Sequence, residues 1–151
     1  YTRAAYADLL LSERRAAETI ELLRGYESLE PLLLRIALAQ QQLRDPGLAL
    51  SRALLMGAFN VEEQRGEAVH RREQARFLLD VAGEPAAALK AAEDDWRAQR
   101  EAADVLILLR AARAAGSADA AAPAVEFVRR HGMQDVRFDP YLKAPPTGSG
   151  T

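Results

Sequence analysis

Apolar residues recur along most of the chain at the i, i+3, i+4 and i+7 spacing that places them on one face of an α-helix. One such set is Ala75, Leu78, Leu79 and Ala82, and a second is Val105, Leu108, Leu109 and Ala112. β-branched residues are sparse, and no window shows the clean alternation of apolar and polar residues that is typical of a strand. The pattern therefore predicts an all-α protein.

Turn-forming residues interrupt this helical pattern. In the run Asp45-Pro46-Gly47 the proline disfavours helical geometry in the residue before it, and Gly66 suits the left-handed cap at a helix end. Further breaks fall at Gly83-Glu84-Pro85 and at Gly116-Ser117. These breaks predict helices near residues 3–12, 15–25, 30–44, 48–65, 67–82, 85–98, 101–115 and 118–131.

The predicted helices fall into pairs that repeat along the chain. The breaks recur near Arg14, Arg44, Gly83 and Gly116, at intervals of 30, 39 and 33 residues. A repeat of about 34 residues that contains two helices has the period of tetratricopeptide-type repeats, and the longer second interval follows from the long helix predicted at 48–65. We expect one helical repeat domain over residues 1–132, with hairpins at about 2–26, 28–66, 67–98 and 101–131.

Small residues at the expected places make the chain resemble the tetratricopeptide repeat family, over nearly its whole length to about residue 132. The residues that carry the resemblance are Ala37 in a first helix, Gly83 and Gly116 at turns, Ala49, Ala88 and Ala121 in second helices, and Pro31 at a repeat end. The aromatic anchors of the family's first helix are mostly missing, and Arg76 stands where a small residue is expected. The resemblance implies a right-handed α-solenoid of about four hairpins, which acts as a scaffold for a partner peptide or protein.

The resemblance also implies where the partner binds, because in this family the first helix of each hairpin lines the concave face. Residues at i, i+4 and i+7 on those helices, off the buried stripe, would face the groove. They are Leu34, Leu38 and Gln41 in the second hairpin, Glu73, Phe77 and Asp80 in the third, and Leu106, Arg110 and Arg113 in the fourth.

Such a groove would carry apolar anchors at one end and two arginines at the other. It would suit an extended or helical peptide with apolar side chains near a carboxylate, which arginine binds in a bidentate manner. The Lys and Asn of the family's peptide-carboxylate clamp are absent from these positions, so that specificity does not carry over. The alternative left open is that Phe77 belongs to the core and that the arginines only solvate a helix.

Composition excludes several function classes. A net charge of −2 and a pI near 5.8 give no general attraction to nucleic acid or to an anionic membrane. No apolar run approaches the roughly 18 to 20 residues that a membrane span needs, so no membrane insertion is expected. The chain has no cysteine, which excludes disulfides, thiolate metal sites and a cysteine nucleophile.

The sequence says less about the source organism of the protein and about its cellular compartment. A cysteine-free chain is compatible with the cytoplasm and with the periplasm alike. The many arginines and alanines, beside only two lysines, are typical of a bacterial protein with a GC-rich genome. Because the chain begins at Tyr1 rather than at Met, we expect it to be a fragment or a processed product.

Three local groups of polar residues are candidate sites of chemistry. The side chains of Glu93, Asp94 and Asp95 point about 100° apart on a helix, so they cannot converge on one atom. The pattern therefore predicts a solvated acidic face, with Trp96 packed between hairpins. The two histidines, His70 and His131, belong to different hairpins and lack zinc-binding spacing, so neither a metal nor a cofactor is expected.

The basic stretch from residue 70 to 76 predicts a solvated helix rather than a nucleic-acid site, because Glu73 interrupts it and no aromatic residue accompanies it for stacking. No phosphate loop or nucleophile elbow is present. We therefore predict a scaffold rather than an enzyme. Two alternatives remain open: a segment of a larger solenoid that self-associates as a homo-oligomer, and an enzyme with a perturbed carboxylate pair across hairpins.

The C-terminal residues divide into two parts. Residues 133–143 are predicted to cap the last hairpin through Val136, Phe138, Tyr141 and Leu142, because the end of a solenoid must be covered. Residues 144–151 contain Pro, Gly, Ser and Thr, with little to bury, and are predicted to be disordered.

Overall fold

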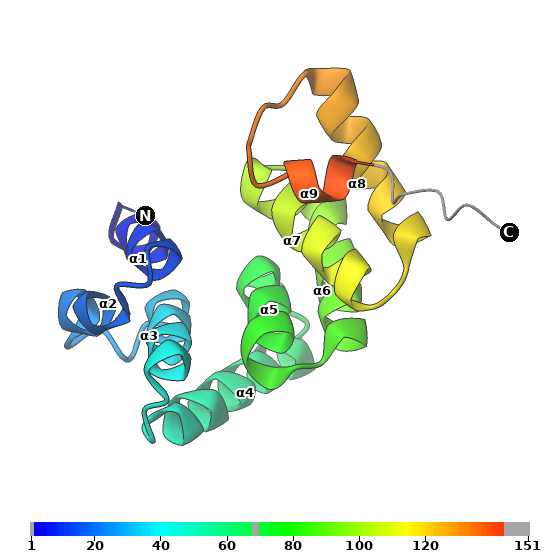
Figure 1. Cartoon of the computed structure of the whole chain (residues 1–151). Helices are drawn as coiled ribbons and strands as arrows, with labels where there is room; N and C mark the ends of the chain where they lie inside the picture. The colour runs from blue at the N-terminus through cyan, green and yellow to red at the C-terminus, as the bar shows by residue number, and fades with distance from the viewer. Residues whose placement is uncertain (1, 68–69, 144–151) are drawn as a thin grey trace, which may run out of the picture.

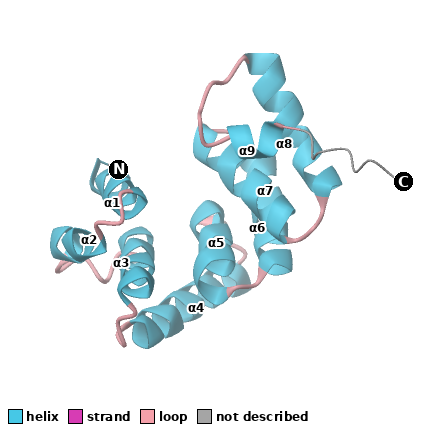
Figure 2. Ribbon diagram, in the orientation of Figure 1, coloured by secondary structure: helices cyan, strands magenta, loops and turns pink. Residues whose placement is uncertain are grey.

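The computed structural model of the chain describes residues 2–67 and 70–143 (Figure 1). Every regular element in this part is a helix, which confirms the all-α prediction (Figure 2). The predicted disordered tail, 144–151, lies outside the described residues. The elements are α1 (Thr2–Ser12), α2 (Ala16–Leu23), α3 (Glu30–Leu43), α4 (Leu48–Arg65), α5 (Arg71–Phe77), the π-helical η1 (Leu78–Ala82), α6 (Pro85–Ala98), α7 (Ala102–Ala114), α8 (Ala118–His131) and α9 (Asp139–Leu142).

All but one of the helices predicted from the pattern begin and end within two residues of their positions in the structure. The exception was predicted at 67–82, but the structure begins α5 at Arg71, and its second part is a π-helical turn. Gly83 ends that turn with a φ of 72°, in the left-handed region that glycine adopts without strain. The π-helical geometry widens the backbone there, and periodicity alone does not predict it.

Each pair of consecutive helices packs as a hairpin: α1 with α2, α3 with α4, α5 and η1 with α6, and α7 with α8. The first helices of successive hairpins also contact one another, so that α1, α3, α5 and α7 follow one another along one side of the molecule (Figure 1). The chain as a whole follows an arc from α1 to α8. This succession brings residues from all four hairpins to one face.

The largest core cluster lies between the third and fourth hairpins. It includes Leu108, 1% exposed, and Trp96, 8% exposed, whose ring meets Phe127 of α8 edge to face at a centroid distance of 5.3 Å. Trp96 therefore packs between hairpins as predicted. A second cluster joins α3, α4 and α5, where the rings of Phe59 and Phe77 lie 5.5 Å apart.

The segment after α8 folds back onto the fourth hairpin. Phe138 is fully buried in the same cluster as Leu108, and Tyr141 and Leu142 are partly buried against it. Val136 does not take part, contrary to the prediction, because it is 83% exposed. A turn closed by the hydrogen bond from the Phe138 N–H to the Asp135 carbonyl buries Phe138 and leaves Val136 facing solvent.

Candidate functional site

A groove of about 680 Å³ runs along the first helices of all four hairpins. Its apolar lining includes Leu11 of α1, Leu38 of α3, and Leu106 and Ile107 of α7. Its polar lining comes from the first helices, from Arg14 in the turn after α1, from η1, and from Arg137 in the C-terminal segment. The groove therefore collects side chains from all four hairpins.

The structure brings together most of the residues predicted for the groove. Those that line it are Leu38, Gln41, Glu73, Asp80, Leu106 and Arg110. Gln41 is exposed and Leu38 is half-buried, so both are accessible from the groove.

Leu34 and Phe77 do not line the groove, and their prediction is corrected. Both side chains are fully buried in the cluster with Leu55 and Phe59 of α4. The groove-facing residues follow the spacing i, i+3 and i+7 rather than i, i+4 and i+7. On α5 and η1, for example, they are Glu73, Arg76 and Asp80. The predicted positions 34 and 77 are each one residue away from groove-lining positions, which turns the side chain about 100° toward the core.

Arg113 also lies elsewhere. Its Nη2 donates a hydrogen bond of 2.7 Å to the Pro140 carbonyl, and its Cζ lies 4.6 Å from the centroid of the Tyr141 ring. Arg113 therefore holds the C-terminal segment against α7 and is not available to a partner in the groove.

Asp8 of α1 is the centre of a charge network on the groove surface. Arg35 Nη2 donates to its Oδ2 at 2.9 Å, and Arg76 Nη1 donates to its Oδ1 at 2.7 Å. Burial raises the pKa of Asp8, but Arg76 and Arg35 outweigh burial and hold that pKa below its ordinary value. Asp8 thus stays ionised and joins α1 to α3 and α5.

The network continues to both sides of Asp8. Arg110 of α7 forms a bidentate pair with Asp80, at 3.2 and 2.5 Å, and Arg76 Nε lies 3.8 Å from Asp80. On the other side, Arg35 Nη1 lies 3.6 Å from Glu73. Because Asp80 already occupies the guanidinium of Arg110, the predicted pair of free arginines at one end of the groove is not present.

Positive charge nevertheless exceeds negative charge among the groove residues. The lining arginines are Arg14, Arg35, Arg72, Arg76, Arg110 and Arg137, against Asp8, Glu73 and Asp80. Arg72 and Arg137 are paired with Asp104 and Asp135, which do not line the groove. Arg14 is exposed and forms no ion pair with the residues that the structure describes, so it is the groove cation most accessible to an acidic ligand.

The acidic face predicted at Glu93, Asp94 and Asp95 is only partly correct. Asp94 is ion-paired with Arg71 at 3.0 Å and with Arg97. Asp95 is not solvated, because it is 3% exposed and faces Asp104 of α7. Helix α6 directs Asp95 toward the fourth hairpin. The 100° between consecutive helical residues does not show which of the three acidic residues faces that hairpin.

Asp95 and Asp104 form the perturbed carboxylate pair across hairpins that an enzyme would require. Burial and the neighbouring Asp104 raise the pKa of Asp95 to about 7. Asp104 accepts a 2.9 Å hydrogen bond from Arg72 and a 2.7 Å bond from the N–H of Glu101, the N-cap residue of α7. The two carboxyls are 3% and 1% exposed and do not line the groove, so a substrate in the groove does not reach them.

Sequence reasoning missed Asp8, Arg35 and Arg76 as groove residues. A signal for Arg35 was present, because it stands inside the apolar run LLLRIALA. An arginine within a buried stripe requires a partner that neutralises it. Nothing local identifies that partner, since Asp8 lies 27 residues earlier.

Comparison with protein-family models, with curated proteins and with solved structures finds no match to this chain. None of the described helices combines the length and the apolar character that crossing a bilayer demands. The groove and its residues are therefore the basis for assigning a function.

Proposed function

We propose that this chain is a protein–protein interaction scaffold, a right-handed tetratricopeptide-like solenoid of four hairpins that binds a partner segment in the groove. The observation that carries the proposal is that α1, α3, α5 with η1, and α7 all contribute to one groove. A surface shared by successive first helices is what a solenoid of helical hairpins offers to an extended ligand.

The lining indicates the chemistry of the partner. Leu38 and Leu106 offer apolar contacts on opposite sides of the groove, from α3 and α7. Arg14, the groove arginine that forms no ion pair with the described residues, favours a segment with an acidic side chain. We therefore propose a peptide segment, extended or helical, that combines apolar and acidic side chains.

The π-helical turn η1 supports the same location. Asp80 belongs to this turn and lines the groove. Single π-helical turns occur frequently at functional sites, because they are less favourable than α-helix and persist where they position a side chain.

Affinity capture from a cell lysate tests the proposal with two matched substitutions. Gln41→Trp places a bulky side chain in the groove, whereas Gln64→Trp makes the same change on the exposed surface of α4, outside the groove. We expect the unmodified chain and Gln64→Trp to capture the same partner, and Gln41→Trp to lose it while its circular dichroism spectrum is unchanged. Equal capture by both variants would contradict binding in the groove.

A second candidate function is self-association, and one observation favours it. Leu50, Leu54 and Val61 lie on one face of α4 and are 66%, 52% and 44% exposed. An exposed apolar stripe of this kind is typical of a protein contact. Light scattering on a sizing column distinguishes this candidate: a mass above 16.5 kDa that returns to the monomer value on Leu54→Glu would support it.

A further inference from the structure

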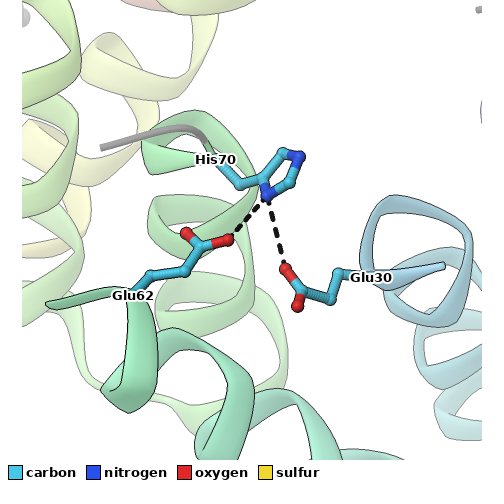
Figure 3. A group of neighbouring side chains, drawn as sticks. All are labelled: Glu30, Glu62 and His70. Atoms are coloured by element: carbon cyan, nitrogen blue, oxygen red, sulfur yellow. Dashed lines mark hydrogen bonds and ion pairs between the residues drawn. The ribbon is translucent and has the colours of Figure 1, made fainter. Parts of the chain in front are cut away.

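Three side chains that could each bind a metal ion meet at the junction of the second and third hairpins, away from the groove (Figure 3). Glu30 is the first residue of α3, Glu62 lies in the last turn of α4, and His70 directly precedes α5. Figure 3 shows the Nδ1 atom of the imidazole directed toward both carboxylates. Their three donor atoms lie within 4.8 Å of one another.

The separations between the donor atoms suit a single ion. His70 Nδ1 is 2.8 Å from Glu62 Oε1 and 3.3 Å from Glu30 Oε2. Metal–ligand bonds of about 2.0–2.2 Å in tetrahedral or octahedral geometry place neighbouring ligand atoms about 3–3.5 Å apart. Small side-chain rotations therefore suffice to place one ion between the three atoms.

The cluster is not satisfied by its own hydrogen bonds. Nδ1 of an imidazole carries at most one hydrogen, and the shorter distance assigns it to Glu62. Glu30 Oε2 is buried from solvent and accepts no hydrogen bond from the described residues. Two carboxylates thus compete for one donor, which a cation would relieve.

We infer that Glu30, Glu62 and His70 form a binding site for a divalent transition-metal ion of the first row, such as Zn²⁺ or Mn²⁺. Two carboxylate oxygens and one imidazole nitrogen suit these ions better than Mg²⁺ or Ca²⁺, which prefer oxygen ligands alone. The three side chains are 31%, 18% and 31% exposed, so the ion can enter from solvent. Three protein ligands leave a further position for water or for an atom of a partner.

This inference departs from the expectation, drawn from the sequence, that the chain holds no metal. The expectation depended on the absence of a short histidine motif, but the ligands here come from positions 30, 62 and 70 of the chain. Because these positions belong to α3, α4 and the start of α5, the bound ion would link the second hairpin to the third. Binding to the folded state alone should then raise the melting temperature.

Isothermal titration calorimetry with ZnCl₂ and MnCl₂ tests the site on the full chain without a histidine tag, after metals are removed with a chelator. The variants are Glu62→Gln and His70→Gln. His131→Gln is the matched control, because His131 is the other histidine of the chain and is exposed, with a hydrogen bond to the Phe127 carbonyl and its ring against the Phe127 ring. We expect one ion per chain, bound about tenfold or more weakly by each variant and unchanged by the control.

A second measurement keeps the test decisive if a variant unfolds. Co²⁺ added to the unmodified chain should give a visible absorption spectrum that Zn²⁺ abolishes, together with a higher melting temperature in Zn²⁺. The absence of Zn²⁺, Mn²⁺ and Co²⁺ binding by the folded, unmodified chain would overturn the inference. Binding that survives in folded His70→Gln and is lost in His131→Gln would overturn it as well.

Discussion

Asp8 accepts a hydrogen bond of 2.7 Å from Arg76, a residue 68 positions later in the chain. This contact joins the first hairpin to the third across the groove surface, without passing through the second hairpin that separates them in sequence. Arg35 of the second hairpin completes the arrangement by donating to the other oxygen of Asp8. The groove is therefore held in shape by charge pairs as well as by apolar packing.

Removing the central carboxylate should loosen this part of the molecule. Asp8→Ala takes from the largely buried Arg35 its closest carboxylate and leaves Glu73, 3.6 Å away, as its remaining ion-pair partner, so we expect a loss of about 1–3 kcal/mol in the free energy of unfolding. Urea denaturation measures this loss. Glu126→Ala, which removes an exposed pair with Arg130, is the control and should change stability by less than about 0.5 kcal/mol. Equal losses in the two variants would contradict a structural role for Asp8.

The pH dependence of stability should report the buried Asp95. Its pKa is raised to about 7 from an ordinary value of 3.8, so between these values the folded state binds a proton that the unfolded state does not bind. The contribution of Asp95 to stability therefore falls as the pH rises from about 4 to about 7, and is constant above that range. Burial is the main cause of the raised pKa of Asp95; Asp104 and Glu73 raise that pKa further, and Arg72 lowers it.

The substitution Asp95→Asn isolates this contribution. An amide is neutral at every pH and can still donate a hydrogen bond to Asp104, so the variant should gain stability relative to the unmodified chain at pH 8 but not at pH 4. Asp94→Asn is the control, because that neighbour is paired with Arg71 near the surface. A fall in stability that is as steep in Asp95→Asn as in the unmodified chain would show that Asp95 is not its source.

The core between the third and fourth hairpins should respond to truncation according to burial. Leu108 is 1% exposed, and Leu108→Ala should lower the free energy of unfolding by about 2–5 kcal/mol. Leu79, which the pattern predicted to be equally important, is only half-buried, so Leu79→Ala should cost less. Asp94→Ala should cost about 0.5 kcal/mol or less. If Asp94→Ala lost as much stability as Leu108→Ala, the assignment of Asp94 to the surface and of Leu108 to the core would be wrong.

The C-terminal segment should contribute to stability through one side chain. Phe138→Ala removes a fully buried ring and should cost about 3–5 kcal/mol, whereas Val136→Ala changes an exposed residue and should cost less than about 0.5 kcal/mol. Thermal unfolding followed by circular dichroism measures both variants. If Phe138→Ala melts at the temperature of the unmodified chain, the segment after α8 does not stabilise the fourth hairpin.

Most helix positions were predictable from the sequence because their causes are local. Gly66 and Gly83 end helices through their own conformational freedom, and the spacing of apolar residues shows which stretches are helical. The face that each helix turns to the groove was predicted about one residue out of register at positions 34 and 77. That direction depends on packing against α4, a contact that no local pattern specifies.

The sequence did not predict the polar groups of the groove and of the proposed metal site, and the reason is a different one. Arg76 and Asp8, like Glu30 and His70, are brought together by the stacking of whole hairpins, so their separation in sequence carries no signal. Asp95 was predicted to lie on a solvated acidic face with Glu93 and Asp94, because consecutive helical residues point about 100° apart and cannot converge on one atom. Its burial follows from the position of α7, which packs against α6.

Hydrogen–deuterium exchange on the complex with a captured partner shows whether a partner segment binds along the first helices of the hairpins. Exchange should slow in peptides from α1, α3, α5 and α7, which line the groove, and stay unchanged in α2, α6 and α8. Slower exchange confined to α4 or α8, with the groove helices unaffected, would contradict such binding.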